Sequence, residues 1–312
     1  MEALIAIGLF LVGVVVAVWA AERLLEGLVG LAVVLRLAAF AVTAVLSGFE
    51  LENVAVGLAA GARETGAVAL GTVFGGAVFL VCVALGVGAL LYPLEVRLPR
   101  GVLAVFALSP VLVGIGIVDP VTPRWAGIIL LLAFVGAIGY LIVASRRHRF
   151  LHSEEVEEAA EKRRSLGVAL VLTVVGLAAL TLGGELVARG AEGMIAALGV
   201  PALLMGMVVT PAAIEVEEVA RQAIPSRHGR HDISAGNLVG TLLYFLLFNL
   251  GLIALFTPVP VDPQVRMFDW PFTIAVTWLA TAFLWRGRIG RGAGALLVGC
   301  YLLYIALHAV WR

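Results

Sequence analysis

Long apolar stretches, separated by short polar or glycine- and proline-rich segments, run along almost the whole chain. A bilayer core about 30 Å thick requires about 20 apolar residues per helix, so windows of that length predict ten membrane-spanning helices. Five spans fall at roughly 3–33, 37–61, 66–90, 101–118 and 124–145. Five more fall at roughly 167–198, 201–224, 232–257, 269–286 and 292–311. The pattern therefore predicts an all-α polytopic membrane protein.

One long polar segment divides these spans into two sets of five. We expect a first five-helix repeat over residues 1–145, a linker over 146–166, and a second five-helix repeat over 167–312. Within the linker, acidic residues precede basic ones, an order that suits a short helix because it complements the helix dipole.

Composition supports the membrane assignment. Hydrophobic residues make up 62% of the chain and charged residues 13%, whereas soluble domains are about 45–50% apolar and about 25% charged. This excludes a disordered chain, a disulfide-rich secreted protein and a cytosolic enzyme. The 21 basic and 21 acidic residues cancel, so no nucleic-acid partner is expected, and nothing implies a partner protein.

Basic residues concentrate in the loops on the linker's side of the predicted bundle, for example at Arg97, Arg100, Arg227 and Arg230. Loops rich in Lys and Arg remain in the cytoplasm. We therefore expect a plasma or inner membrane protein with residues 146–166 in the cytoplasm and both termini outside.

The two sets of helices share an internal repeat at an offset of 165 residues. The matching blocks are Glu50–Ala55 with Glu215–Ala220, Gly71–Gly76 with Gly236–Thr241, and Leu85–Gly86 with Leu250–Gly251. Because each set has an odd number of helices, the second copy enters the membrane from the opposite side. Inverted repeats of this kind are typical of secondary transporters, whose sites lie near the bilayer midplane.

Five acidic residues lie in this repeat within apolar segments: Glu50, Glu52, Glu215, Glu217 and Glu218. One ionisable side chain at the bilayer centre costs about 2.5–3.5 kcal/mol on insertion scales. The nearby arginines, Arg63 and Arg221, fall at predicted helix ends, so we expect no internal ion-pair network. The compensating charge should then come from cations or protons in solution.

Helical spacing divides the candidate ligands. Residues three apart share a helix face and residues two apart do not. Carboxylate and amide oxygens on one face are hard ligands suited to Ca²⁺, and less tightly to Mg²⁺ or Mn²⁺. The primary candidates are Glu50, Asn53, Glu215 and Glu218.

Four residues are secondary candidates. We expect Glu52 and Glu217 to point away from the shared face, where they could instead be protonated packing residues. Asn237 and Asn249 could be ligands, helix–helix hydrogen bonds or both. No resident cofactor is expected, only a transported inorganic cation, with Ca²⁺ as the leading candidate.

The two repeated blocks resemble those of the sodium/calcium exchanger family in the cation/calcium antiporter superfamily. Its members carry a repeated G-T-S-L-P-E segment, followed 18 residues after its glutamate by G-N-x-x-G-S-N. Residues 48–53 and 213–218 fall on the first motif, and the same spacing leads to Gly71 and Gly236. Glu26-Gly27 and Glu192-Gly193 resemble the family's E-G-A. The resemblance implies an antiporter with alternating access, not an enzyme.

The chain departs from the family's motif at several positions. Glu218 falls on the family's coordinating glutamate, but its partner position is Asn53. Glutamates replace the motif's serines at 50 and 215 and its prolines at 52 and 217, while Leu80 and Phe245 replace polar ligands. Extra carboxylates favour proton coupling, because neighbouring acids share protons that a metal can displace.

We therefore expect a secondary active antiporter that exchanges a divalent cation, with Ca²⁺ leading, for Na⁺ or H⁺. One alternative is a proton-coupled exchanger of Mg²⁺ or Mn²⁺. Another is an intramembrane metal-dependent enzyme, which the sequence disfavours because it contains no H-E-x-x-H or similar motif.

Overall fold

The structure is a computed structural model that describes residues 2–34, 50–148 and 165–310. The described elements of the first repeat are helical apart from one short strand. They are α1 (Glu2–Val34), α3 (Leu51–Ala62), α4 (Gly66–Phe79), the π-helix η1 (Leu80–Ala84), α5 (Leu85–Leu91), β1 (Leu94–Glu95), α6 (Arg100–Leu112), the 3₁₀ turn η2 (Val113–Gly116) and α7 (Arg124–His148).

The second repeat has the same layout with more interruptions. Its elements are α9 (Leu166–Leu198), α10 (Ala202–Leu204), η3 (Met205–Val209), α11 (Thr210–Ile214), η4 (Glu215–Glu217), α12 (Glu218–Arg227), α13 (His231–Leu243), η5 (Tyr244–Asn249), α14 (Leu250–Phe256), η6 (Val265–Asp269), α15 (Trp270–Trp285), β2 (Arg288–Ile289) and α16 (Arg291–Val310). Strands β1 and β2 pair antiparallel and join a loop of each repeat.

The predicted polytopic all-α fold is confirmed. Within the described residues, seven helices are long and apolar enough to cross a membrane, and two shorter apolar helices cover Leu51–Ala62 and Arg100–Gly116. Residues 37–49 of the predicted second span, and the predicted linker helix, lie outside the described residues. The chain is a multi-pass membrane protein.

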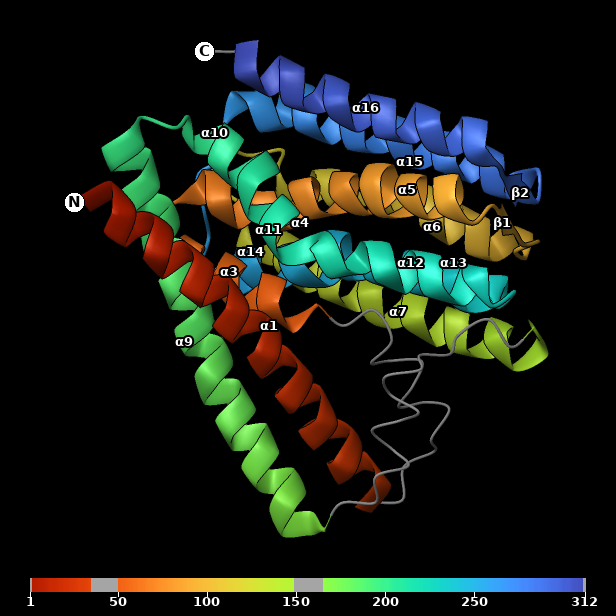
Figure 1. Ribbon diagram of the computed structural model, residues 1–312, viewed down its shortest axis with the longest axis horizontal. Helices are drawn as coiled ribbons and strands as arrows, with labels where there is room; N and C mark the ends of the chain where they lie inside the picture. The colour runs from red at the N-terminus through yellow and green to blue at the C-terminus, as the bar shows by residue number, and fades with distance from the viewer. Residues whose placement is uncertain (1, 35–49, 149–164, 311–312) are drawn as a thin grey trace.

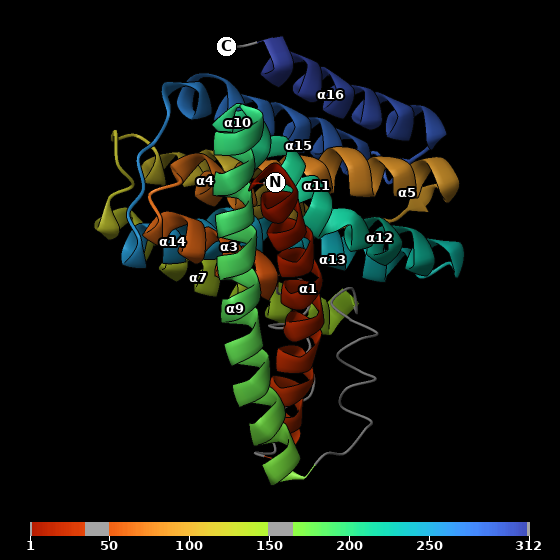
Figure 2. The same cartoon turned by 60° about the vertical axis from the view of Figure 1, so that its left-hand side comes forward.

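Helices α1 and α9 lie side by side and cross the other helices at a steep angle (Figures 1 and 2). Glycines of α9 sit directly on the backbone of α1: Gly176 at Leu24, Gly183 at Ala17 and Gly190 at Phe10. Residue numbers rise along α9 as they fall along α1, so the first helices of the two repeats are antiparallel. This is the geometry that an inverted repeat requires, and small residues allow such close packing in membranes.

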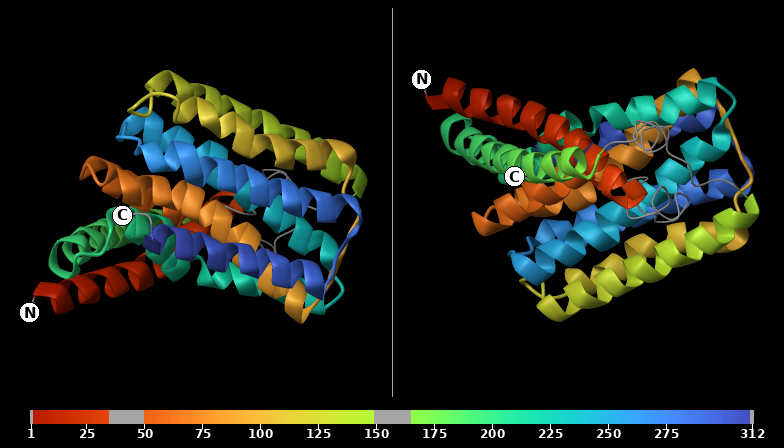
Figure 3. Two further views of the ribbon diagram at one scale, coloured as in Figure 1. Left: turned by 90° about the horizontal axis from the view of Figure 1, so that it is seen from above. Right: turned by 90° about the horizontal axis from the view of Figure 1, so that it is seen from below.

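The remaining helices run roughly alongside one another. Helices α6 and α7 lie at one edge of the bundle and α1 at the opposite edge (Figure 3). The two repeats meet most closely where α4 crosses η3, since a Cβ atom on Gly71 would lie 1.9 Å from the carbonyl oxygen of Gly206. The third helix of one repeat therefore packs against the second helix of the other, as the repeat predicts.

Both repeats also carry a π-helical segment at equivalent places, η1 at Leu80–Ala84 and η5 at Tyr244–Asn249. The two segments nearly coincide under the 165-residue offset. Such π-bulges interrupt the regular helical hydrogen bonds and occur frequently at functional sites. The interruptions thus repeat along with the sequence and flank the crossing of α4 and η3.

Candidate cation site

The repeated acidic residues lie at helix ends and breaks. Glu50 directly precedes α3, with φ −95° and ψ 71°, outside the helical region. The 3₁₀ turn η4 separates α11 from α12, and Glu218 opens α12. A helix N-terminus carries partial positive charge that stabilises a nearby carboxylate. The breaks therefore position the acids where their charge is best tolerated.

Residues from both repeats meet at these breaks and form an acidic cluster of Glu50, Glu52, Asn53, Glu215, Glu217 and Glu218. Carboxylate oxygens of Glu50, Glu52 and Glu217 lie within 4.8 Å of one another. Asn53 Nδ2 donates a hydrogen bond to Glu215 Oε1 at 2.5 Å. Glu50, Asn53 and Glu218 are fully buried, and Glu215 and Glu52 are nearly so. The four primary candidates thus occupy one buried region between the repeats.

Arg221 also belongs to this region, and it contradicts the expectation that no internal ion pair is available. Its Nη1 lies 2.9 Å from Glu50 Oε1 and 2.7 Å from Glu218 Oε1, while its Nη2 lies 2.8 Å from Glu217 Oε1. Side chains on a helix point toward its N-terminus. Arg221, one turn after Glu218, therefore reaches back to the start of α12.

The expected outward direction of Glu52 and Glu217 is also wrong. That expectation assumed unbroken α-helices, in which residues two apart face different sides. Glu50 stands before its helix, and residues 215–217 form a 3₁₀ turn. The α-helical spacing rule therefore does not apply across either pair, and Glu52 and Glu217 both reach Glu50.

The two secondary asparagines differ. Asn237 adjoins the cluster, since its Nδ2 donates to Glu218 Oε2 at 2.9 Å. Asn249 bonds no acid in the described structure; its Nδ2 donates to Thr72 Oγ1 at 3.0 Å and to the Thr72 carbonyl at 3.1 Å. Asn249 lies beside Gly57, one turn along α3 from Asn53, because a Cβ at Gly57 would be 3.3 Å from Asn249 Oδ1.

Several buried oxygens of the cluster have no hydrogen-bond donor among the described residues: Glu50 Oε2, Glu215 Oε2 and Asn53 Oδ1. A buried acceptor left unsatisfied is destabilising. Carboxylate and amide oxygens with free lone pairs are the ligands that hard cations take. The arrangement can therefore accept a cation between the two repeats.

Sequence reasoning did not assign Arg221 to the cluster. The signal was available, since Arg221 stands three residues after Glu218 and helical residues at that spacing form ion pairs. Its contact with Glu50 across the repeat interface could not be read from spacing along one helix.

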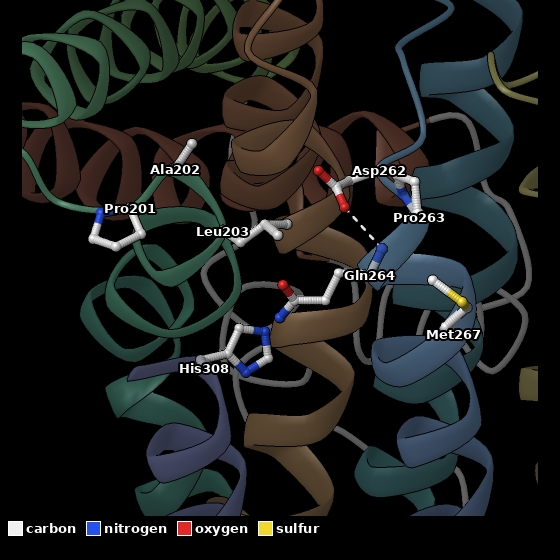
Figure 4. Close-up of a pocket in the computed structure, with 8 residues that line it drawn as sticks. All are labelled: Pro201, Ala202, Leu203, Asp262, Pro263, Gln264, Met267 and His308. Carbon is white, nitrogen blue, oxygen red and sulfur yellow. Dashed lines mark hydrogen bonds between the residues drawn. The ribbon is translucent and has the colours of Figure 1, made fainter. Parts of the chain in front are cut away.

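A separate pocket of about 450 Å³ lies away from this cluster, between α10, η6 and α16 (Figure 4). It is lined by Pro201, Ala202, Leu203, Asp262, Pro263, Gln264, Met267 and His308. Behind the pocket lining, the Nε2 of His308 lies 3.0 Å from the buried Asp269 Oδ1, which also accepts a hydrogen bond from Tyr304. These contacts hold α16 against η6, and no residue of the acidic cluster lines the pocket.

Comparison with known proteins matches both halves of the chain. The sequence profile of the sodium/calcium exchanger protein family matches residues 5–143 and 168–310. The inner membrane protein YrbG of Escherichia coli (strain K12) is 27% identical over 97% of each chain. The sodium/calcium exchanger MaX1 of Methanosarcina acetivorans is 24% identical over 43% of this chain and 39% of its own length.

The fold is also similar to that of a solved structure. A structure of the sodium–calcium exchanger NCX_Mj, soaked with 100 mM Na⁺ and 10 mM Sr²⁺, superimposes with a TM-score of 0.62 at 20% identity. The match covers 97% of this chain and 98% of the other. It establishes the architecture as two repeats of five helices.

Proposed function

The chain belongs to the sodium/calcium exchanger protein family, and from this premise we propose that it exchanges Ca²⁺ for Na⁺ or H⁺ at the acidic cluster. The family consists of secondary transporters, so the chain is a membrane cation exchanger and not an enzyme. The substrate, the coupling ion and the ligands are the parts that we propose.

The observation that supports this proposal most strongly is the burial of carboxylates from both repeats at one place. Glu50 and Glu218 are fully buried and come from opposite repeats. A cation bound between them would draw the repeats together, and its release would let them separate. Alternating access requires such a site, because the ion must be reachable from one side at a time.

We propose Glu50, Asn53, Glu215 and Glu218 as the ligands, together with Glu52 and Glu217. The unpaired oxygens of Glu50, Glu215 and Asn53 favour an ion with several oxygen ligands, as Ca²⁺ requires. Asn237 would position Glu218 through its hydrogen bond. Asn249, held by Thr72, would lie one turn away.

The richness in carboxylates favours H⁺ over Na⁺ as the coupling ion, because clustered acids exchange protons for metal. It also keeps Mg²⁺ or Mn²⁺ as a second candidate substrate. We further propose the division into residues 1–145, 146–166 and 167–312, on the basis of the two sets of spans and the polar segment between them. The basic loops support an orientation with the linker in the cytoplasm and both termini outside.

Flux measurements on purified protein in liposomes test the proposal. We expect uptake of ⁴⁵Ca²⁺ to follow an imposed Na⁺ or H⁺ gradient, with unlabelled Mg²⁺ and Mn²⁺ as competitors. Glu215→Gln and Glu218→Gln should each lower the uptake about 10-fold or more, since losing a buried charged partner costs about 1.5–3 kcal/mol and 1.4 kcal/mol is tenfold.

Glu95→Gln is the matched control, because Glu95 is exposed and pairs with Arg288 in the β1–β2 loop pair. It removes one carboxylate at a distance from the cluster and should leave uptake unchanged. Uptake that ignores both gradients, or that survives both cluster substitutions, would contradict the proposed site.

A further inference from the structure

We propose that Arg221 is a tethered cation that occupies the exchange site when no ion is bound, so that the empty carrier can reorient and carry out net cation transport as well as exchange. The inference rests on the proposed function, because it concerns the same acidic cluster. It assigns to this chain a mode of transport that a strictly coupled exchanger lacks.

The position of the guanidinium group supports this role. One nitrogen atom, Nη1, contacts Glu50 of the first repeat and Glu218 of the second at 2.9 and 2.7 Å. A Ca²⁺ ion would bind the same oxygens at about 2.3–2.6 Å. The ion and the Arg221 nitrogen therefore compete for one place, and Arg221 bridges the repeats as the ion would.

A further contact of Arg221, with Glu217, provides a way for its guanidinium group to leave the buried carboxylates. Its Nη2 pairs with Glu217 at 2.8 Å, and the side chains of Arg221 and Glu217 are 23% and 30% exposed, while those of Glu50 and Glu218 are fully buried. Arg221 can release the two buried carboxylates while it stays paired with the half-buried one. An incoming cation then takes the buried oxygens without leaving the guanidinium group unpaired.

The pairing is confined to one repeat. Under the 165-residue offset, the position equivalent to Arg221 in the first repeat is Val56, which is fully buried. The first repeat thus folds its equivalent helix with an apolar residue there. The inverted-repeat architecture therefore does not itself require a cation at this position. This favours a role for Arg221 in the cation site over a role in the folding of the repeat.

The consequence for transport follows from the burial of charge. An exchanger is strictly coupled when its empty site cannot cross the membrane, because burying carboxylates without a counter-charge is strongly unfavourable. Arg221 supplies a counter-charge that travels with the protein. The ion-free cluster can then close, and the carrier can return without a second ion.

Two flux measurements on liposomes loaded with ⁴⁵Ca²⁺ test this inference. Self-exchange is measured into a medium with unlabelled Ca²⁺. Net efflux is measured into a medium that lacks Ca²⁺ and Na⁺, at equal pH on both sides, with K⁺ and valinomycin clamping the potential and a trapped pH dye recording H⁺ uptake. We expect the wild-type protein to show net efflux above the leak of protein-free liposomes and without matching H⁺ uptake, because efflux in exchange for H⁺ does not need an ion-free return.

The ratio of net efflux to self-exchange is the decisive quantity. It should fall at least 10-fold in Arg221→Gln and be partly restored in Arg221→Lys, which keeps the charge but loses the forked geometry. Arg227→Gln is the matched control, because Arg227 is exposed at the other end of the same helix. Its ratio should equal that of the wild type.

The outcomes separate the two proposals. If the wild type shows no self-exchange of ⁴⁵Ca²⁺, and no self-exchange of Mg²⁺ or Mn²⁺ either, the proposed function fails. If self-exchange proceeds but wild-type net efflux does not exceed the leak, or is matched by H⁺ uptake, the tethered-cation inference is overturned without any variant. Equal ratios in the wild type and Arg221→Gln overturn it as well.

Discussion

At the scale of single residues, Glu218 is held between two different donors. Arg221 binds its Oε1 and Asn237 donates to its Oε2. A buried carboxylate oxygen without a hydrogen-bond donor is destabilising, and these two donors satisfy both oxygens of Glu218. In the proposed site, Asn237 would therefore act on a bound cation through Glu218, and removing it tests whether that carboxylate is a ligand.

We predict that Asn237→Ala raises the Ca²⁺ concentration for half-maximal uptake about 10-fold, since a hydrogen bond to a charged group contributes about 1.5–3 kcal/mol. Concentration-dependent ⁴⁵Ca²⁺ uptake measures the change. Ser234→Ala is the control, because Ser234 lies one turn earlier on α13 and donates to Gln222. An equal shift in both variants would mean that the effect comes from α13 packing and not from Glu218.

The acidic cluster was predictable from the sequence to the extent that the repeat aligned Glu50 with Glu215 and Asn53 with Glu218. Their meeting in space follows from the inverted topology. The directions of Glu52 and Glu217 and the reach of Arg221 were not predictable, because they depend on backbone breaks and on contacts between repeats. A sequence pattern records which residues share a helix, but only where the helix is continuous.

At the scale of elements, the close crossing of α4 and η3 depends on two glycines. A Cβ on Gly206 would lie 2.0 Å from the carbonyl oxygen of Ala67, and one on Gly71 would meet Gly206 in turn. The clashing atoms belong to the backbone, so no rotamer change relieves the overlap. The crossing holds η3, which is followed by the short helix α11 and then by the 3₁₀ turn η4 that carries Glu215.

We predict that Gly206→Ala lowers the thermal stability of the detergent-purified protein strongly, beyond the about 1–3 kcal/mol that overpacking usually costs. Gly299→Ala is the matched control, because a Cβ on Gly299 in α16 has no atom within 4 Å. It should leave the melting temperature unchanged or slightly raised, since alanine favours a helix. Similar melting temperatures for the two variants would show that the crossing tolerates a side chain.

Hydropathy predicted the helices well and their interruptions poorly. The spans at 166–198 and 291–310 agree with prediction within a residue or two, because about 20 apolar residues have few other ways to satisfy their backbone in lipid. The span predicted at 201–224 as one helix is instead divided by η3 and η4, and its last part, α12, ends at Arg227. The hydropathy of a segment does not determine which carbonyl oxygen accepts a hydrogen bond from each backbone amide. The π-helix and the 3₁₀ turn differ from an α-helix in that hydrogen-bond pattern.

At the scale of the whole molecule, the contacts between the two repeats include those along α1 and α9, at the crossing of α4 and η3, and at the acidic cluster. The first two contacts are apolar and are built from small residues. The third places carboxylates from both repeats together. A bound cation would therefore change how firmly the repeats hold together, and its effect should appear in the stability of the whole chain.

We predict that Ca²⁺ raises the melting temperature of the detergent-purified protein by several degrees, since a ligand at 100 times its Kd stabilises the folded state by about 2.7 kcal/mol. Choline chloride at the same ionic strength controls for screening.

The double variant Glu50→Gln with Glu218→Gln removes one fully buried acid from each repeat and should abolish the shift, while Glu95→Gln should keep it. Because the bound ion would link the repeats, stabilisation should require both acids, and each single variant should lose most of it. If none of Ca²⁺, Mg²⁺, Mn²⁺ and Na⁺ changes the melting temperature, the cluster does not bind these cations in the folded protein.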